Sequence, residues 1–276
     1  MTPDKTKIRN AATIIVVRNK KKNPSVLMGQ RGINAAFMPS KFVFPGGAVD
    51  DEDLLINFEN PINEVCKARL KKENKNGQWN ALVSAAIREL FEETGQIIGV
   101  KREWLEAPNN WEEFAKTGHV PDASKMHFVF RAITPPGRPR RFDARFFLIE
   151  AEELKTNLDD FSMASDELSH LQWIPIKDTK KFDLPFITQV VLAEITGNLA
   201  NTGSPKRVPF FRIQQKKASF TISMMAIVNQ TTKIKPNALI PISNIPNISL
   251  LRIRSLKNRV VINKLKISSI WPTALT

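Results

Sequence analysis

Segment 88–95 limits most strongly what this chain can fold into, because it places three carboxylates on one side of a short helix. The segment reads R-E-L-F-E-E-T-G, and Glu89, Glu92 and Glu93 lie within about 100° of one another at about 100° per residue. The apolar side chains of the same stretch fall on nearly the opposite face. One side of the helix is therefore predicted to pack in a core, while the other concentrates negative charge.

This acidic face needs a counter-charge, because like charges at helical spacing destabilise a helix. A hard cation such as Mg²⁺ offsets the repulsion, since it prefers carboxylate oxygen. Arg88 is adjacent to Glu89 and four residues before Glu92, where it can orient a carboxylate by a charge-assisted hydrogen bond. Gly95 suits a left-handed helix cap. The pattern favours a metal-binding face, with a solvated helix carrying Arg–Glu pairs as the alternative.

The motif R-E-x-x-E-E-x-G resembles the second half of the Nudix box, G-x5-E-x7-R-E-U-x-E-E-x-G-U, in which U is aliphatic. The chain departs from this box upstream of Arg88. Asn80 stands eight residues before Arg88, where the box has Glu, and the glycines are instead Gly46 and Gly47. Residues 48–79 form an insertion between these glycines and the helix. Asn is favoured at helix N-caps, so we expect Asn80 to begin the helix.

The resemblance implies a Nudix hydrolase, an enzyme that cleaves the pyrophosphate bond of a nucleoside diphosphate joined to another group, with Mg²⁺ or Mn²⁺ as cofactor. Bound metals would neutralise the diphosphate oxygens, lower the pKa of a water and place it in line with one phosphorus. Arg88 would hold Glu89 in place. The resemblance makes the motif residues catalytic (Arg88, Glu89, Glu92 and Glu93) and the metal ligands Glu89, Glu92, Glu93 and the Gly47 carbonyl.

An insertion at this point of the box is similar to that of the branch containing the peroxisomal coenzyme A diphosphatases and their bacterial relatives. Four further stretches add to the likeness: 26–32, 37–39, 43–47 and 141–147. In the coenzyme A signature, Arg31 and F-P-G-G match, whereas Ala36 and Ser40 stand where the signature has Arg and Gly. Coenzyme A or acyl-CoA is therefore the leading substrate. ADP-ribose, dinucleotides, and a non-catalytic nucleotide-binding regulator of the same fold remain alternatives.

Three arginines outside the helix are candidates for binding the substrate. Arg31 is the first of them, by its place in the coenzyme A signature. Arg141 and Arg145 share one face of a predicted strand with Asp143, since side chains alternate along a strand. The arginine fork matches phosphate geometry, which favours a phosphate-facing pair. A half-exposed edge strand with an internal ion pair is the alternative.

The order of predicted elements indicates the fold class. Strands separated by a few helices predict a layered α/β domain with a mixed sheet, and the resemblance implies a Nudix-type α/β/α sandwich over residues 8–215. A turn at residues 19–24 suggests that the first two strands form a hairpin, and Pro45-Gly46-Gly47 is expected to stop the third. Strands are predicted at 13–18, 25–30, 41–44, 126–134, 141–151 and around 171–173, and helices at 64–71, 81–94, 111–116 and 185–199.

The formal charge of +14 is concentrated in one part of the chain. No Asp or Glu follows Glu194, and the last 82 residues carry 13 Lys and Arg, whereas the first 194 carry 28 basic and 27 acidic residues. The enzyme-like part is thus nearly neutral, so the total charge is not evidence that this part binds nucleic acid. The resemblance implies a small nucleoside diphosphate as its partner. Residues 216–276 are predicted to form a basic C-terminal extension. It is an arm for nucleic acid or an anionic surface, a packed addition, or a segment without a defined role.

The cysteine count and the length of the apolar runs predict the cellular compartment. The single cysteine excludes an internal disulfide and suits a reducing compartment. The first apolar run, residues 11–17, is too short for a secretory signal, and the apolar run in the extension is too short to span a bilayer. The expected location is the cytoplasm.

Overall fold

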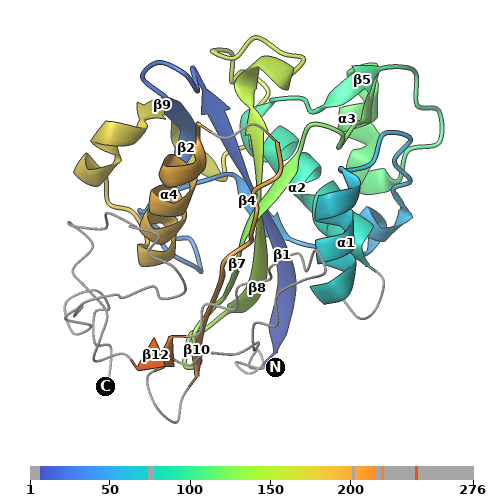
Figure 1. Ribbon diagram of the computed structural model, residues 1–276. Coiled ribbons are helices and arrows are strands. Elements are labelled where there is room, and N and C mark those ends of the chain that lie inside the picture. Colours follow the sequence, from blue (N-terminus) through green and yellow to red (C-terminus); the bar gives the residue numbers. More distant parts are fainter. Residues whose placement is uncertain (1–6, 74–77, 201–202, 215–218, 221–239, 242–276) are drawn as a thin grey trace.

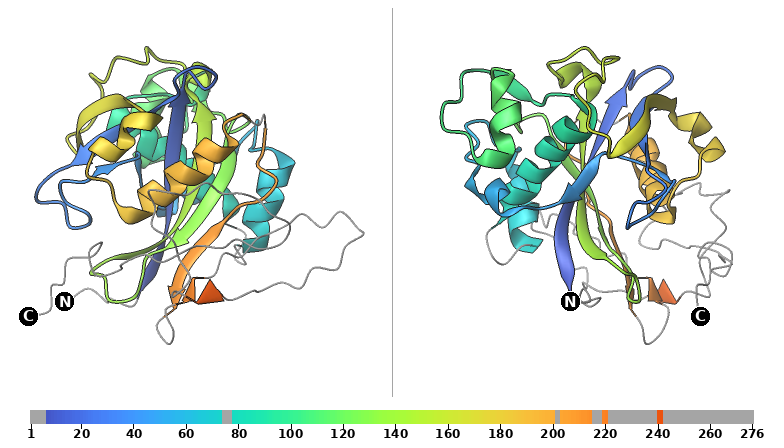
Figure 2. Two further views of the ribbon diagram at one scale, coloured as in Figure 1. Left: turned by 60° about the vertical axis from the view of Figure 1, so that its left-hand side comes forward. Right: turned by 180° about the vertical axis from the view of Figure 1, so that it is seen from behind.

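A mixed β-sheet lies between two layers of helices in the computed structural model, which describes residues 7–73, 78–200, 203–214, 219–220 and 240–241 (Figure 1). Helix α4 covers one face of the sheet, and α1, α2 and α3 lie on the other, as the view from behind also shows (Figure 2). The helices are α1 (Glu64–Glu73), α2 (Trp79–Thr94), α3 (Glu112–Lys116) and α4 (Phe186–Asn198). This is the predicted α/β/α sandwich with a mixed sheet.

The described strands form two sheets. In the large sheet the order is β12-β11-β10-β7-β8-β1-β2-β3, with β4 also on β1 and β9 also on β2; β5 and β6 form a separate pair. The strands are β1 (Ile8–Arg18), β2 (Ser25–Arg31), β3 (Phe42–Val43), β4 (Gly46–Ala48), β5 (Gly99–Lys101), β6 (His119–Pro121), β7 (His127–Ile133), β8 (Arg141–Glu150), β9 (Leu168–Pro175), β10 (Phe210–Gln214), β11 (Ser219–Phe220) and β12 (Ile240–Pro241). Short 3-10 helices are η1 (Asp51–Leu55), η2 (Asn109–Trp111), η3 (Ala151–Glu153) and η4 (Ile176–Lys181).

Strand β1 is the branch point that positions the site. It runs parallel to β8 along its length, and its C-terminal end forms the predicted hairpin with β2 through Val17 and Val26. Its N-terminal half instead pairs with β4, where Ala12 lies opposite Gly47. Strands β2 and β4 thus pair with the same edge of β1, one after the other. This pairing places the glycines of β4 next to α2.

Each face of the sheet has its own apolar core. The core under α1, α2 and α3 includes Ile14, Leu90, Trp111 and Phe147, all fully buried. The core under α4 includes Ile15, Val26 and Val191, also fully buried. Consecutive residues of β1 enter opposite cores, as the alternation of a strand requires. The acidic helix is therefore fixed to the sheet by burial along its apolar face.

The third strand ends before Pro45, as expected, because β3 stops at Val43. Gly46 and Gly47 then begin a further strand, β4, which was not predicted and forms because β1 offers a free edge there. The alternative of an edge position for β8 is wrong, because β8 lies between β1 and β7 in the sheet. The other predicted strands and helices are present, with boundaries within a few residues. Basic and apolar residues alternate in segment 252–267, which predicts a strand or two, and this segment lies outside the described residues.

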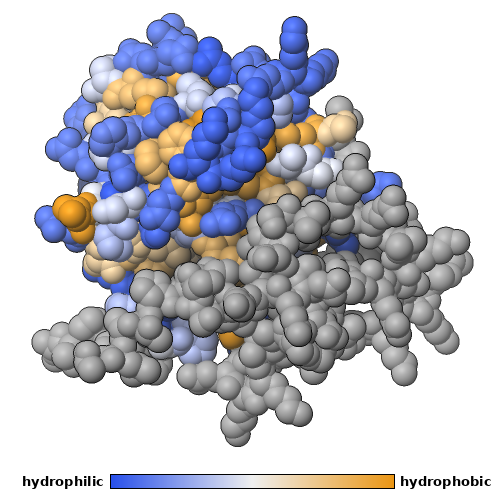
Figure 3. Space-filling model, turned by 90° about the vertical axis from the view of Figure 1, so that its left-hand side faces the viewer, coloured by the Kyte–Doolittle hydropathy of each residue, from blue (hydrophilic) through white to orange (hydrophobic). Residues whose placement is uncertain are grey.

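The surface on the α4 side mixes apolar and hydrophilic side chains, as the coloured part of Figure 3 shows. Single exposed apolar side chains are ordinary on a folded domain. None of the helices in the described part of the chain combines the length and the apolar character needed to cross a membrane.

Candidate active site

Helix α2 carries the acidic face between two well-defined ends. It begins at Trp79 with Gln78 as its N-cap, so the prediction that Asn80 caps the helix is wrong. The Asn80 amide instead donates to the carbonyls of Leu54 and Ile56, at 3.1 and 3.3 Å, because the insertion packs against this end. At the other end Gly95 has φ 72°, the left-handed cap expected from the sequence.

Strand β4 lies directly against the carboxylates of α2. The Gly46 N–H donates to Glu93 Oε2 over 2.7 Å. At Gly47 the Glu89 carboxylate occupies the space that a side chain would need, so only glycine fits without displacing it. The structure thus brings together Gly47, Glu89 and Glu93, three of the residues that the sequence placed at the metal site.

Arg88 connects the carboxylates through a buried network. Its Nη1 donates to Glu89 Oε1 over 3.1 Å and to Glu92 Oε2 over 2.9 Å. Its Nε and Nη2 donate to the two oxygens of Asp53, each over 3.0 Å, and Nη2 also reaches the Ala48 carbonyl. Arg88 and Asp53 are buried, at 3% and 0% exposure. A fork held on both sides cannot rotate, so Arg88 fixes the directions of Glu89 and Glu92.

The electrostatics of this face favour loss of negative charge. Burial raises the pKa of Glu89 to about 7, although the nearby Arg88 opposes the shift. Burial, and next the charge of Glu89, raise the pKa of Glu93 well above its usual range. Burial also raises the pKa of Glu92. Without a further positive charge nearby, the neutral, protonated form of these carboxyl groups is favoured.

The residues present fit a divalent cation. Glu93 Oε1 is buried and has no hydrogen-bond partner among the described residues, and an unsatisfied buried oxygen is costly. No three His, Cys, Asp or Glu side chains of the described chain converge as a ready cluster for a metal. Mg²⁺ does not require one, because it uses one or two carboxylates and keeps waters or substrate phosphates as its other ligands. Glu89, Glu93 and the Gly47 carbonyl are the donors that would hold it.

The predicted substrate-binding arginines have different surroundings. Arg31, at the end of β2, donates from Nη2 to Glu167 Oε1 over 2.8 Å, and its charge opposes the rise in the pKa of Glu93. Arg145 is 2% exposed and bonds to Asn10 and to the carbonyl of Asp143.

Arg141 lies farther along β8 and donates to the Thr134 carbonyl over 3.2 Å. The internal ion pair considered for this strand is present, because Arg145 lies 3.1 Å from the Asp143 carboxylate. A role for Arg141 or Arg145 in substrate binding stays a prediction.

The sequence and the fold of this chain were compared with those of known proteins. No family model matches the chain. It is 31% identical to nudix hydrolase 7 of Caenorhabditis elegans, itself a provisional assignment, over 183 residues that cover 62% of this chain and 52% of that protein. Its fold is similar to the crystal structure of a Nudix hydrolase from Alicyclobacillus acidocaldarius, with a TM-score of 0.53 and 23% identity over 71% of this chain and 96% of the other. The chain is therefore similar in sequence to a Nudix hydrolase, and its fold is similar to that of another. It spans about half the length of its curated relative.

One acidic residue of the stretch that resembles the Nudix box was not predicted from the sequence. Counting six residues on from Gly47 reaches Asp53, the spacing that the box sets between its glycine and its first acidic residue. Counting back from Arg88 reached Asn80 instead, because the insertion separates Asp53 from the helix. Asp53 is the buried partner of Arg88, whereas the Asn80 amide bonds to backbone carbonyls. The spacing from Gly47 was the signal available in the sequence.

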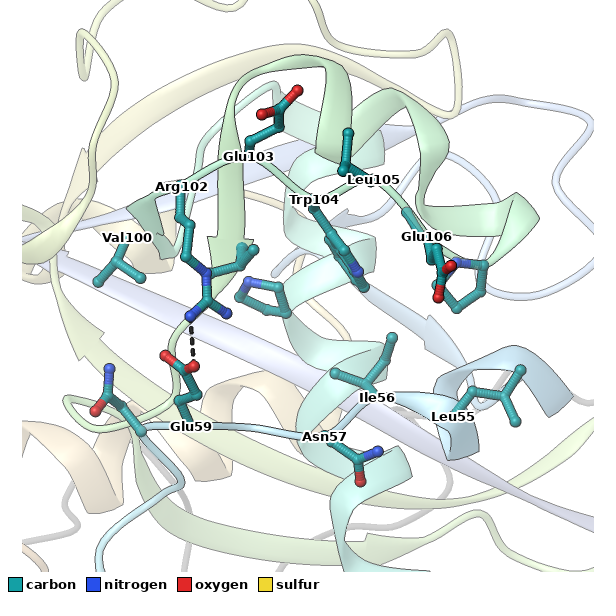
Figure 4. A pocket seen from close by; sticks show the side chains of 15 residues that line it. Leu55, Ile56, Asn57, Glu59, Val100, Arg102, Glu103, Trp104, Leu105 and Glu106 are labelled. Atoms are coloured by element: carbon teal, nitrogen blue, oxygen red, sulfur yellow. Dashed lines mark hydrogen bonds and ion pairs between the residues drawn. The ribbon is translucent and has the colours of Figure 1, made fainter.

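A pocket of about 820 Å³ lies apart from the acidic face of α2, between the insertion and the segment around β5 (Figure 4). Trp104 and Ile56 line it, and an ion pair between Arg102 and Glu59 closes one side. None of the α2 carboxylates lines it. It shares Leu55 with η1, the short helix that carries Asp53. The pocket therefore adjoins the support of Arg88 and not the acidic face itself.

Proposed function

We propose that the chain is a Mg²⁺- or Mn²⁺-dependent hydrolase that cleaves the pyrophosphate bond of a nucleoside diphosphate derivative. The observation that carries this proposal is the buried oxygen of Glu93 without a partner, next to Glu89 and against the backbone of β4. Two buried carboxylates that water cannot solvate need a counter-charge, and a cation bound between them supplies it. The substrate diphosphate then binds where acids alone would repel it.

The chain's own residues supply rigidity. Arg88 is fixed by Asp53 and in turn fixes Glu89 and Glu92, so these carboxylates need no reorganisation when the substrate arrives. The Gly46 N–H holds Glu93 in the same way. When bound, Mg²⁺ or Mn²⁺ would neutralise phosphate charge and acidify the attacking water. Among the three glutamates, Glu93 is the leading candidate for direct contact with the cation, because it is the most deeply buried.

Coenzyme A or acyl-CoA is the substrate that we propose first. The support is the sequence likeness of segments 26–32 and 43–47 to the coenzyme A diphosphatase branch, with Arg31 as the matching arginine. Arg31 is also the predicted phosphate contact whose charge acts on Glu93. ADP-ribose and dinucleotides are the next candidates. A cytoplasmic location stays a prediction.

Replacing Glu93 by Gln tests the proposal. The wild-type chain with Mn²⁺ should release two phosphate-bearing products from one member of a panel containing coenzyme A, acyl-CoA, ADP-ribose and dinucleotides, read by chromatography. Glu93→Gln should lower kcat/KM by about a hundredfold or more. Without metal it should keep or gain thermal stability, because a neutral amide removes the buried charge.

Glu64→Gln is the matched control. Glu64 lies on α1 in an exposed pair with Lys67, so the activity of this variant should equal that of the wild type. Equal turnover by Glu93→Gln would contradict the proposal. Nucleotide binding by the wild type without metal-dependent turnover would favour the regulator instead.

A further inference from the structure

An ion pair between Arg31 and Glu167 borders the acidic face. Arg31 ends β2, and Glu167 precedes Leu168, the residue of β9 that is paired with Arg31. Nη2 of Arg31 lies 2.8 Å from Glu167 Oε1. Arg31 Nε is buried and has no hydrogen-bond partner among the described residues. Glu167 therefore satisfies only part of the Arg31 fork, and a donor remains for another anion.

The segment that carries Glu167 is attached to α2. Ser165 N–H donates to the Glu92 carbonyl over 2.8 Å. Met163 packs beside Gly95, close enough to meet any side chain placed there. Both contacts lie at the last turn and cap of the helix that carries the site. They fix where Glu167 stands relative to Glu92.

Glu167 and Arg31 both act on the buried glutamates. After the larger effect of burial, the charge of Glu167 contributes to the raised pKa of Glu89 and of Glu93, while the charge of Arg31 opposes the rise for Glu93. Glu167 is thus a fourth glutamate beside this acidic face, and it is paired with Arg31, whereas Glu89 and Glu92 are paired with Arg88. Its side chain is 54% exposed, so it can turn without disturbing the core.

We propose that the Arg31–Glu167 pair is an exchangeable latch, in which a substrate phosphate takes Arg31 and the freed Glu167 carboxylate turns towards a cation held by Glu89 and Glu93. This inference rests on the proposed function. The exchange is favourable because phosphate can engage both Nε and Nη2 of the fork, whereas Glu167 engages Nη2. Breaking the Arg31–Glu167 pair also requires little free energy, since exposed ion pairs contribute little stability.

The latch makes the binding of phosphate and of cation cooperative. A phosphate on Arg31 releases an additional oxygen ligand, so each ligand should strengthen the binding of the other. A structural clamp has no such effect, because breaking it only loosens the segment before β9. The two roles therefore differ in the sign of their effect on phosphate binding.

Calorimetry on the full chain with α,β-methylene-ADP, a non-hydrolysable nucleoside diphosphate, tests the latch. Without metal, Glu167→Gln should bind this analogue about two- to fivefold more tightly than the wild type, because an internal competitor of that strength is removed. In the wild type the analogue should tighten Mn²⁺ binding about fivefold or more, and Glu167→Gln should abolish this coupling. For substrate turnover, the variant should lose kcat about tenfold without a rise in KM.

The control is Glu113→Gln, which breaks an exposed ion pair with Lys116 on α3 and should behave as the wild type throughout. Unchanged or weaker binding of the analogue by metal-free Glu167→Gln would overturn the latch, as would coupling that persists in this variant. A wild type that neither binds Mn²⁺ nor turns over substrate would instead refute the proposed function. The metal-free comparison would still decide whether Glu167 competes for Arg31.

Discussion

At the scale of the residue, the site depends on a single arginine that serves several acids. Arg88 contacts Asp53, Glu89 and Glu92, and Asp50 lies 3.7 Å away. Burial alone would lower the pKa of Arg88, but the hydrogen bond to Asp53 and the surrounding carboxylates raise it above its usual value. Arg88 therefore stays charged, while burial disfavours negative charge on Glu89 and Glu93.

This effect of burial predicts an inverted dependence of stability on pH in the absence of divalent cations. The pKa of Glu89 is raised from 4.5 to about 7 on folding. Between these values the folded chain keeps a proton that the unfolded chain has lost, so the free energy of unfolding falls as the pH rises. The raised pKa of Glu93 acts in the same direction.

The measurement is urea unfolding in EDTA at about pH 5 and pH 8, for the wild type and Glu89→Gln. The wild type should lose about 1–3 kcal/mol more than the variant over this interval. Added Mn²⁺ should reduce the loss. Identical pH profiles for the two chains would show that Glu89 carries no such charge penalty.

At the scale of the element, α2 was predictable because its signals are local. The apolar stripe, the acidic spacing and Gly95 lie within one helix, and each follows from helical geometry. Strand β4 was not predictable, because Gly46 and Gly47 have low strand propensity and become a strand only by pairing with β1. The two-stranded β5–β6 sheet is similarly short and was missed.

The site shows the same division between local and distant signals. Glu89 and Glu93 were predicted from their spacing on one helix and from the resemblance to the Nudix box. Asp53 and Glu167 were missed, because they reach the site from 35 residues before Arg88 and from the segment before β9. No periodic pattern reports such contacts, which arise when the insertion and β9 pack on α2.

The 3-10 helix η1 is predicted to be the structural support of the acidic face. Asp53→Asn keeps the size of the side chain but leaves Arg88 with one fewer buried counter-charge. Breaking a buried pair in this way should lower the free energy of unfolding by about 3–5 kcal/mol. Metal affinity should fall with it, since Glu89 and Glu92 lose their fixed directions.

Asp51→Asn is the matched control, because Asp51 lies on the exposed side of the same 3-10 helix. It should change stability by no more than about 0.5 kcal/mol. Urea unfolding and Mn²⁺ titration measure both effects. Equal results for the two variants would mean that Asp53 does not support Arg88 energetically.

At the scale of the whole molecule, charge and fold divide the chain near the same place. The nearly neutral part holds most of the sandwich and the acidic helix α2, while the basic excess follows Glu194. Strand β10 belongs to the first part by packing, because it pairs with β7 and Phe211 is buried against α4. The three alternatives for residues 216–276 (an arm for an anionic partner, a packed addition, or a segment without a defined role) stay open, since most of this segment lies outside the described residues.

Two truncations test where the enzyme ends. A chain of residues 1–214 keeps β10, and it should hydrolyse substrate with kcat/KM within about twofold of the full chain, because no predicted site residue is lost. A chain of residues 1–209 lacks Phe211, and the cavity that this side chain leaves in the core under α4 should lower the free energy of unfolding by about 3–5 kcal/mol. If the extension is a basic arm, the full chain should bind RNA or anionic vesicles in a salt-dependent way that residues 1–214 do not. An inactive but folded 1–214 chain would show instead that the extension belongs to the catalytic unit.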